Sequence, residues 1–246
     1  AIADANCDPS RAVMIGDSHE ADIIGALQVG MHAIHFAAAG VSPQKASMEK
    51  LNSVNVYQSS RLIKLAFQAG VKRFIAAGTC LEYGEESNNW DYIPPNAKLN
   101  PLCDYSTSKA KSFKLLYEFA LENNIEMFYG RIFSAYGTGQ YEKNFWPSLK
   151  SSAISGKNFQ MTKGEQIRDF IKVDDVATHF TNAFLRNDIK IGSPLIVNIG
   201  SGSGMKLKDF AIQEWNKFNA EGELFFGLKN NRKNEIKRMV ANINGL

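Results

Sequence analysis

Short apolar runs alternate along this chain with longer stretches in which apolar residues recur at helical spacing. The apolar runs predict buried strands over residues 11–17, 31–36, 71–77, 125–133 and 195–199. The helical spacing predicts helices over residues 18–27, 55–66, 110–121 and 144–156, and another from residue 207. Strands that alternate with helices are typical of α/β proteins. We therefore expect an α/β fold built on a parallel sheet.

Composition narrows the class of protein. The chain has 246 residues, of which 44% are hydrophobic and 22% charged, so it can bury a sizeable core. A net charge of +3 gives no reason to expect nucleic acid or a membrane surface as a partner. Three scattered cysteines and four histidines show no metal-ligand spacing, and no apolar run reaches the ~20 residues of a membrane helix. We expect a cytoplasmic protein, without a secretory signal.

A tyrosine and a lysine lie in the stretch 104–109, which opens the helical run predicted over residues 110–121. Tyr105 and Lys109 are four residues apart, which places both side chains on the same side of a helix. An ammonium beside a phenol favours the phenolate and lowers the pKa of the tyrosine. A tyrosine with a lowered pKa can act as a general acid or base near neutral pH. The alternative is a solvated tyrosine and lysine at helical spacing.

A hydroxyl group follows the apolar run before this helix. The run from Phe74 to Ala77 leads into Gly78-Thr79, so a buried parallel strand would carry Thr79 at its carboxyl end. Open α/β sheets bind their ligands at that edge. Thr79 is therefore a candidate site residue.

The first 36 residues predict a βαβ unit. A strand ends at Gly16-Asp17, Ser18 opens a helix as its cap, and a second strand ends at Phe36. This unit resembles the C-terminal motif of haloacid-dehalogenase-like hydrolases, in which the acidic residues matching Asp17 and Asp22 help to hold Mg²⁺. That chemistry also needs an Asp-x-Asp motif, which the chain lacks. A scaffold role is therefore favoured over a Mg-dependent phosphatase.

Thr79, Tyr105 and Lys109 together resemble the catalytic triad of the extended short-chain dehydrogenases/reductases, the NAD-dependent epimerase/dehydratase family. Thr79 precedes Tyr83-Gly84 by four residues, as the strand-end hydroxyl does in that family. The resemblance covers about residues 34–246. It implies a doubly wound, Rossmann-like parallel sheet with a small C-terminal substrate lobe.

The resemblance also implies a division of the chain. Residues 1–36 would be the βαβ segment packed into the same sheet, in place of the usual glycine-rich dinucleotide motif. Residues 37–140 would hold the remaining Rossmann core with the triad. Residues 141–246 would hold a mixed substrate-binding lobe and the last sheet elements.

The implied cofactor is NAD or NADP. Family-matched positions that would contact it are Phe36, Ala37, Ala38, Asn55, Lys109 and Phe133. The turn that should hold the pyrophosphate reads Gly16-Asp17-Ser18-His19-Glu20-Ala21-Asp22. It lacks the second and third glycines of the family and carries three carboxylates, which repel a pyrophosphate at close range.

The implied substrate is a nucleotide-diphosphate sugar. Arg168, within Arg168-Asp169-Phe170-Ile171, matches the arginine that grips the diphosphate in the family, and Arg232 matches a second one. Asn144 is a third substrate candidate. The alternatives are a salt bridge of Arg168 to Asp169 or Asp174, and a solvated basic face around Arg232.

The resemblance implies hydride transfer at a sugar carbon. Tyr105 would exchange the hydroxyl proton, Lys109 would hold the cofactor ribose, and Thr79 would hydrogen-bond the reacting oxygen. Cys80-Leu81 replace the acid-base pair of the dehydratases, so a dehydratase is disfavoured. The run Gly-Thr-Cys-x-Glu-Tyr-Gly over residues 78–84 resembles the 4-ketoreductases of the family more than its epimerases, so a 4-ketoreductase is favoured over an epimerase. A catalytically inactive or chimeric α/β domain is the alternative. The helices after Asn55 and Tyr105 are where a homodimer would form.

Overall fold

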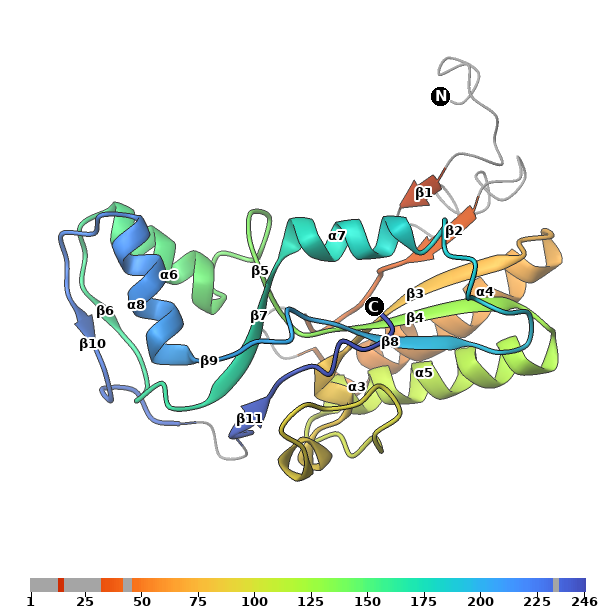
Figure 1. Cartoon of the computed structure of the whole chain (residues 1–246), viewed down its shortest axis with the longest axis horizontal. Helices are drawn as coiled ribbons and strands as arrows, with labels where there is room; N and C mark the ends of the chain where they lie inside the picture. Colours follow the sequence, from red (N-terminus) through yellow and green to blue (C-terminus); the bar gives the residue numbers. More distant parts are fainter. Residues whose placement is uncertain (1–12, 16–31, 42–45, 232–234) are drawn as a thin grey trace, which may run out of the picture.

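A five-stranded parallel sheet forms the centre of the protein (Figure 1). The computed structural model describes residues 13–15, 32–41, 46–231 and 235–246. The strands follow the order β1-β2-β3-β4-β8, and each pairs in parallel with its neighbour. Their bounds are Val13–Ile15 (β1), His32–His35 (β2), Arg73–Thr79 (β3), Glu126–Ile132 (β4) and Leu195–Ile199 (β8). The predicted strands and their parallel arrangement are confirmed. β8 has the predicted bounds, and the other four strands are shorter than or shifted from their apolar runs.

The longest pairing in this sheet joins β3 and β4. It runs without interruption from Arg73 opposite Glu126 to Thr79 opposite Ile132. The five central residues of each strand are buried, which explains why both read as apolar runs in the sequence. Thr79 is therefore the last residue of the middle strand, at the carboxyl edge of the sheet.

Helices cover both faces of the sheet (Figure 1). On one face, α4 (Ser59–Gln68) and α5 (Asp104–Glu122) pack on β3 and β4 through an apolar cluster that includes Leu62 and Leu116. On the other face, α7 (Val173–Asn182) buries Val176 and Phe180 against the same strands. No helix among the described residues is long and apolar enough to cross a membrane.

The helix predicted over residues 55–66 begins earlier than the sequence indicated. Helical structure starts with α3 (Met48–Leu51), continues through a π-helical stretch, η3 (Asn52–Gln58), and passes into α4. Ser47 caps the start by accepting a hydrogen bond from the Lys50 amide. The polar residues of η3 hid this extension, because only Asn55 and Val56 of that stretch are buried.

A smaller group of elements, the small lobe, lies beside the sheet, at the left of Figure 1. Its core contains Leu149, Phe159, Ala211 and Trp215. The elements are α6 (Phe145–Ile154), α8 (Leu207–Lys217), β6 (Phe159–Gln160) and β10 (Leu224–Phe225).

A second small sheet joins this group to the central sheet. Strand β7 (Ile167–Lys172) pairs in parallel with β5 (Ser134–Tyr136) and β11 (Arg238–Met239), and antiparallel with β9 (Gly204–Lys206). The chain enters β5 directly after the carboxyl end of β4. The small sheet therefore begins at the carboxyl edge of the central sheet, where Thr79 also lies.

Candidate active site

A short helical turn presents Thr79 at the end of β3. The 3-10 helix η4 (Cys80–Glu82) starts immediately after it. The Leu81 amide donates to the Thr79 hydroxyl at 3.3 Å, and the Thr79 amide donates to a Glu82 carboxylate oxygen at 2.9 Å. This reciprocal capping fixes the backbone of the half-buried Thr79.

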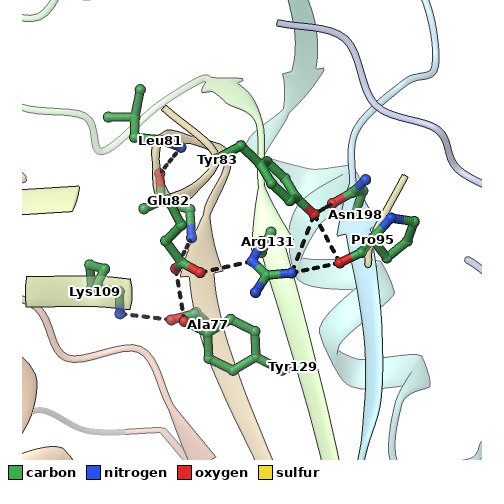
Figure 2. Close-up of polar contacts among 10 residues, drawn as sticks. Ala77, Leu81, Glu82, Tyr83, Pro95, Lys109, Tyr129, Arg131 and Asn198 are labelled. Carbon is green, nitrogen blue, oxygen red and sulfur yellow. Dashed lines mark hydrogen bonds and ion pairs between the residues drawn. The ribbon is translucent and has the colours of Figure 1, made fainter. Parts of the chain in front are cut away.

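Lys109 joins helix α5 to the strand that ends at Thr79. Its side chain is buried, with 5% of the residue exposed, and its ammonium donates to the carbonyl oxygen of Ala77 at 2.8 Å (Figure 2). Ala77 lies two residues before Thr79 on β3. Tyr105 lies one turn before Lys109 on α5 and is half-buried, and its ring packs against Gly40 after β2. The structure thus brings the three predicted triad residues to one edge of the sheet.

The predicted effect of Lys109 on Tyr105 is wrong for this structure. The pKa of Tyr105 is raised, because burial disfavours the phenolate and the nearby Glu82, Cys80 and Cys103 add to the shift. Burial lowers the pKa of Lys109, and the negative charge of Glu82 opposes that shift. The sequence spacing identified the pair but not its burial, which dominates both pKa values.

Asn55 holds the chain segment that follows β2. It is fully buried, its side-chain oxygen accepts from the Ala39 amide at 2.7 Å, and its nitrogen donates to the Ala39 carbonyl at 3.1 Å. The same nitrogen donates to the Ser108 hydroxyl at 2.8 Å. Asn55 therefore ties Ala39, which follows Ala37 and Ala38, to Ser108 of α5, the residue before Lys109.

The two aromatic residues predicted at the cofactor lie in different surroundings. The half-buried Phe36 packs edge-on against Phe180 of α7, at 4.7 Å between ring centroids. Phe133 is buried with Cys80 and Tyr83 behind the turn at Thr79. Ala37 and Ala38 are half-buried.

A buried polar network, which the sequence did not indicate, is centred on Glu82, the residue that accepts a hydrogen bond from the Thr79 amide (Figure 2). The Glu82 carboxylate accepts from the Tyr129 hydroxyl and from the Arg131 guanidinium, each at 2.8 Å. Arg131 also donates to the Tyr83 hydroxyl and the Pro95 carbonyl. A charged residue in the apolar run of β4 was the one available signal for this network.

A cavity of about 530 Å³ lies between the small lobe and the two strands β5 and β7. Arg168 and Asn144 both line it, as do Ser134 and Ala135 of β5. Arg168 forms an ion pair with Glu235 at 3.6 Å, whereas the predicted partner Asp169 accepts backbone bonds from Ser201, Gly202 and Ala241. Two predicted substrate residues therefore share one cavity.

Three predicted positions fall outside the described residues: Arg232, Asp17 and Asp22. Within the described part of the chain, no cluster of three or more His, Cys, Asp or Glu side chains could hold a metal ion.

Comparison with known proteins places the chain in a family. The family model described as "NAD dependent epimerase/dehydratase family" matches residues 13–200. The chain belongs to this family. The match begins inside the segment that resembled the haloacid-dehalogenase-like motif, and the comparisons give neither that motif nor a chimeric origin any support.

Curated relatives of this epimerase/dehydratase chain are nucleotide-sugar enzymes. CDP-abequose synthase of Salmonella typhimurium is 28% identical over 204 residues, which cover 80% of this chain and 62% of that protein. The dTDP-D-glucose 4,6-dehydratase of Mus musculus is 27% identical over 216 residues, which cover 85% and 59%. The chain therefore spans about three fifths of the length of these relatives.

Solved structures share the fold. A UDP-N-acetylglucosamine 4-epimerase from Methanobrevibacter ruminantium M1 superposes with a TM-score of 0.82 at 22% identity, covering 93% of this chain and 73% of that one. MoeE5 in complex with UDP-glucuronic acid and NAD gives a TM-score of 0.78 at 23% identity, covering 93% and 75%. At this identity the likeness supports the Rossmann-like fold.

Proposed function

We propose that this chain carries the active site of a nucleotide-sugar enzyme that transfers hydride between NAD or NADP and a sugar carbon. The observation that carries the proposal is the hydrogen bond of Lys109 to Ala77, because it ties the Tyr105 helix to the strand that ends at Thr79. Family membership and the nucleotide-sugar names of the relatives support it.

Each triad residue has a chemical role in this proposal. Thr79 donates a hydrogen bond to the reacting oxygen, and Tyr105 exchanges a proton with it. The raised pKa of Tyr105 keeps the phenol protonated at neutral pH, so it is suited to give a proton to a carbonyl oxygen. This favours a 4-ketoreductase over an epimerase.

The residues around Lys109 fit a nicotinamide cofactor. An ammonium has three N–H donors, and the bond to Ala77 uses one of them, so the group can also hold ribose hydroxyls. The small residues Ala37 and Ala38 permit a ligand to approach the backbone that Asn55 braces. When bound, the nicotinamide supplies or accepts the hydride.

The cavity beside the small lobe is the proposed substrate site. Arg168 presents a planar guanidinium, which binds phosphate oxygens in pairs, and Asn144, just before α6, adds an amide to the same cavity. Glu235 holds Arg168 in place through the ion pair at 3.6 Å. A nucleoside diphosphate is the chemical class that matches this cavity.

Cofactor binding tests the proposal. Titration of the chain with NADH and NADPH, followed by nicotinamide fluorescence, is expected to show saturable binding that Lys109→Met abolishes. Lys111→Met, an exposed lysine on the same helix, is the matched control and should bind as the unmodified chain does. No binding at millimolar cofactor would favour the alternative, an inactive domain, which the carboxylate-rich turn at residues 16–22 supports.

A further inference from the structure

The most deeply buried charge near the triad belongs to a residue outside it. Glu82 has 0% of its surface exposed, yet its carboxylate accepts three hydrogen bonds. The donors are the Thr79 amide at 2.9 Å, the Tyr129 hydroxyl at 2.8 Å and the Arg131 guanidinium at 2.8 Å. These three donors satisfy both oxygens of a carboxylate that lies away from water.

The position of Glu82 links it to both halves of the site. Its bond to the Thr79 amide sets the end of β3. Figure 2 shows the Glu82 carboxylate bonded to the Tyr129 hydroxyl and the Lys109 ammonium bonded to the carbonyl of Ala77, which lies on the same strand as Thr79. Glu82 also forms an ion pair with Arg131 at 2.8 Å.

We propose that Glu82 is a positioning residue, which holds the backbone of Thr79 in place and keeps the buried Lys109 amine in its charged form. The catalytic meaning of this inference rests on the proposed function. Its test is independent of that function, because the charge state of Lys109 can be measured in the free protein.

The charges around Lys109 and Tyr105 agree with the role proposed for Glu82. Burial lowers the pKa of Lys109, and Glu82 acts in the opposite direction. His35, on β2, also interacts with Lys109. The groups that act on Tyr105 are Glu82, Cys80 and Cys103.

The experiment is a pH titration of Lys109 by NMR with ¹³Cε-labelled lysine, in which the Lys109 signal is identified by its loss in Lys109→Met. Glu82→Gln is expected to lower the Lys109 pKa by about one unit, since it removes a nearby opposite charge. Glu85→Gln, the same change at an exposed position three residues later, should leave the titration unchanged.

A second variant guards against loss of folding. Glu82→Gln leaves Arg131 buried without its carboxylate, which can unfold the protein. The double variant Glu82→Gln/Arg131→Gln removes both charges and should still lower the Lys109 pKa, because Glu82 is the neighbour that raises it. An unchanged Lys109 titration in a folded variant of either kind overturns the inference. Failure to bind NADH overturns only the proposed function.

A second readout follows Thr79. Its amide proton, bonded to Glu82, is expected to exchange at least tenfold faster with solvent in Glu82→Gln, because a neutral amide is a weaker acceptor than a carboxylate. Equal exchange in the folded variant would contradict the positioning of Thr79. Activity assays are therefore unnecessary for either half of the inference.

Discussion

Asn55 and Ala39 exchange two hydrogen bonds, with the amide side chain of Asn55 pairing with the backbone of Ala39 as a neighbouring strand would. The distances are 2.7 Å from the Ala39 amide and 3.1 Å to its carbonyl. This pairing gives the backbone hydrogen bonds of Ala39 a partner after β2 has ended at His35. It is the reason that the segment after β2 lies in a defined position beside α5.

Asn55→Ala is expected to destabilise the protein by about 3 kcal/mol. The change leaves both backbone groups of the buried Ala39 without their partner, at roughly 1–3 kcal/mol for each unsatisfied group. Urea unfolding measures the loss. Gln58→Ala, at an exposed position on the same helical segment, should change stability by less than about 0.5 kcal/mol. Equal stability of the two variants would contradict the bracing role.

His35 makes the stability of the protein depend on pH. Its Nε2 lies 2.7 Å from the Ser59 hydroxyl, and burial, followed by the charge of Lys109, lowers its pKa from 6.5 to about 3. The unfolded chain binds a proton below about pH 6.5, whereas the folded chain does not. Stability therefore falls as pH decreases from about 6.5 towards 3, by up to ~1.4 kcal/mol per pH unit.

The measurement is urea unfolding at pH 7.5, 6 and 5 for the unmodified chain and for His35→Gln. The difference in the free energy of unfolding between the two proteins isolates the contribution of His35 from that of the carboxylates, which also titrate. It should change by about 1 kcal/mol or more between pH 6 and 5. A difference that stays constant over this range would show that His35 does not titrate as its burial indicates.

Tyr105 is expected to stay protonated over the pH range in which the proposed reduction is assayed. Because its pKa is raised, the phenol keeps its proton through neutral pH, and the reduction rate should show no alkaline decline from Tyr105 below about pH 9. The assay follows NADH or NADPH consumption with a 4-keto nucleotide sugar. Tyr105→Phe is expected to lower kcat by about 10²–10⁴-fold.

Tyr117→Phe is the matched control, since Tyr117 lies on the same helix and its ring contacts Phe113. It should retain the activity of the unmodified chain. Should the Tyr105→Phe variant retain full kcat, Tyr105 cannot be the proton donor.

Gly78 is required where β3 approaches its end. A Cβ at this position would lie 2.3 Å from the ring of the buried Tyr129, which itself bonds Glu82. Gly78→Ala is therefore expected to destabilise the protein by about 2–3 kcal/mol through overpacking. Gly70→Ala meets no atom within 4 Å and should cost only about 1 kcal/mol, from its left-handed backbone with φ +86°.

Thermal unfolding compares the two glycine variants. A smaller loss in Gly78→Ala than in Gly70→Ala would mean that the Tyr129 ring moves aside without cost. Movement of that ring should also weaken the capping of Thr79, because both groups share the same Glu82 oxygen.

Local features of the site could be predicted from the sequence because they depend on neighbours along the chain. The apolar run before Gly78-Thr79 indicated the strand end, and four-residue spacing placed Tyr105 and Lys109 on one helix face. The two strands predicted within residues 11–36 pair in parallel as β1 and β2, and the helix predicted between them lies outside the described residues. The start of the helix before Asn55 was missed because its first turns are polar.

Tertiary structure alone decided the electrostatics. Lys109 bonds the carbonyl of a strand 32 residues earlier, and Glu82 meets an arginine 49 residues later. Whether burial or a neighbouring charge controls a pKa depends on such contacts, so the raised pKa of Tyr105 could not be inferred from its spacing to Lys109. Sequence periodicity determined which residues share a face, and folding determined how much water and which charges those residues meet.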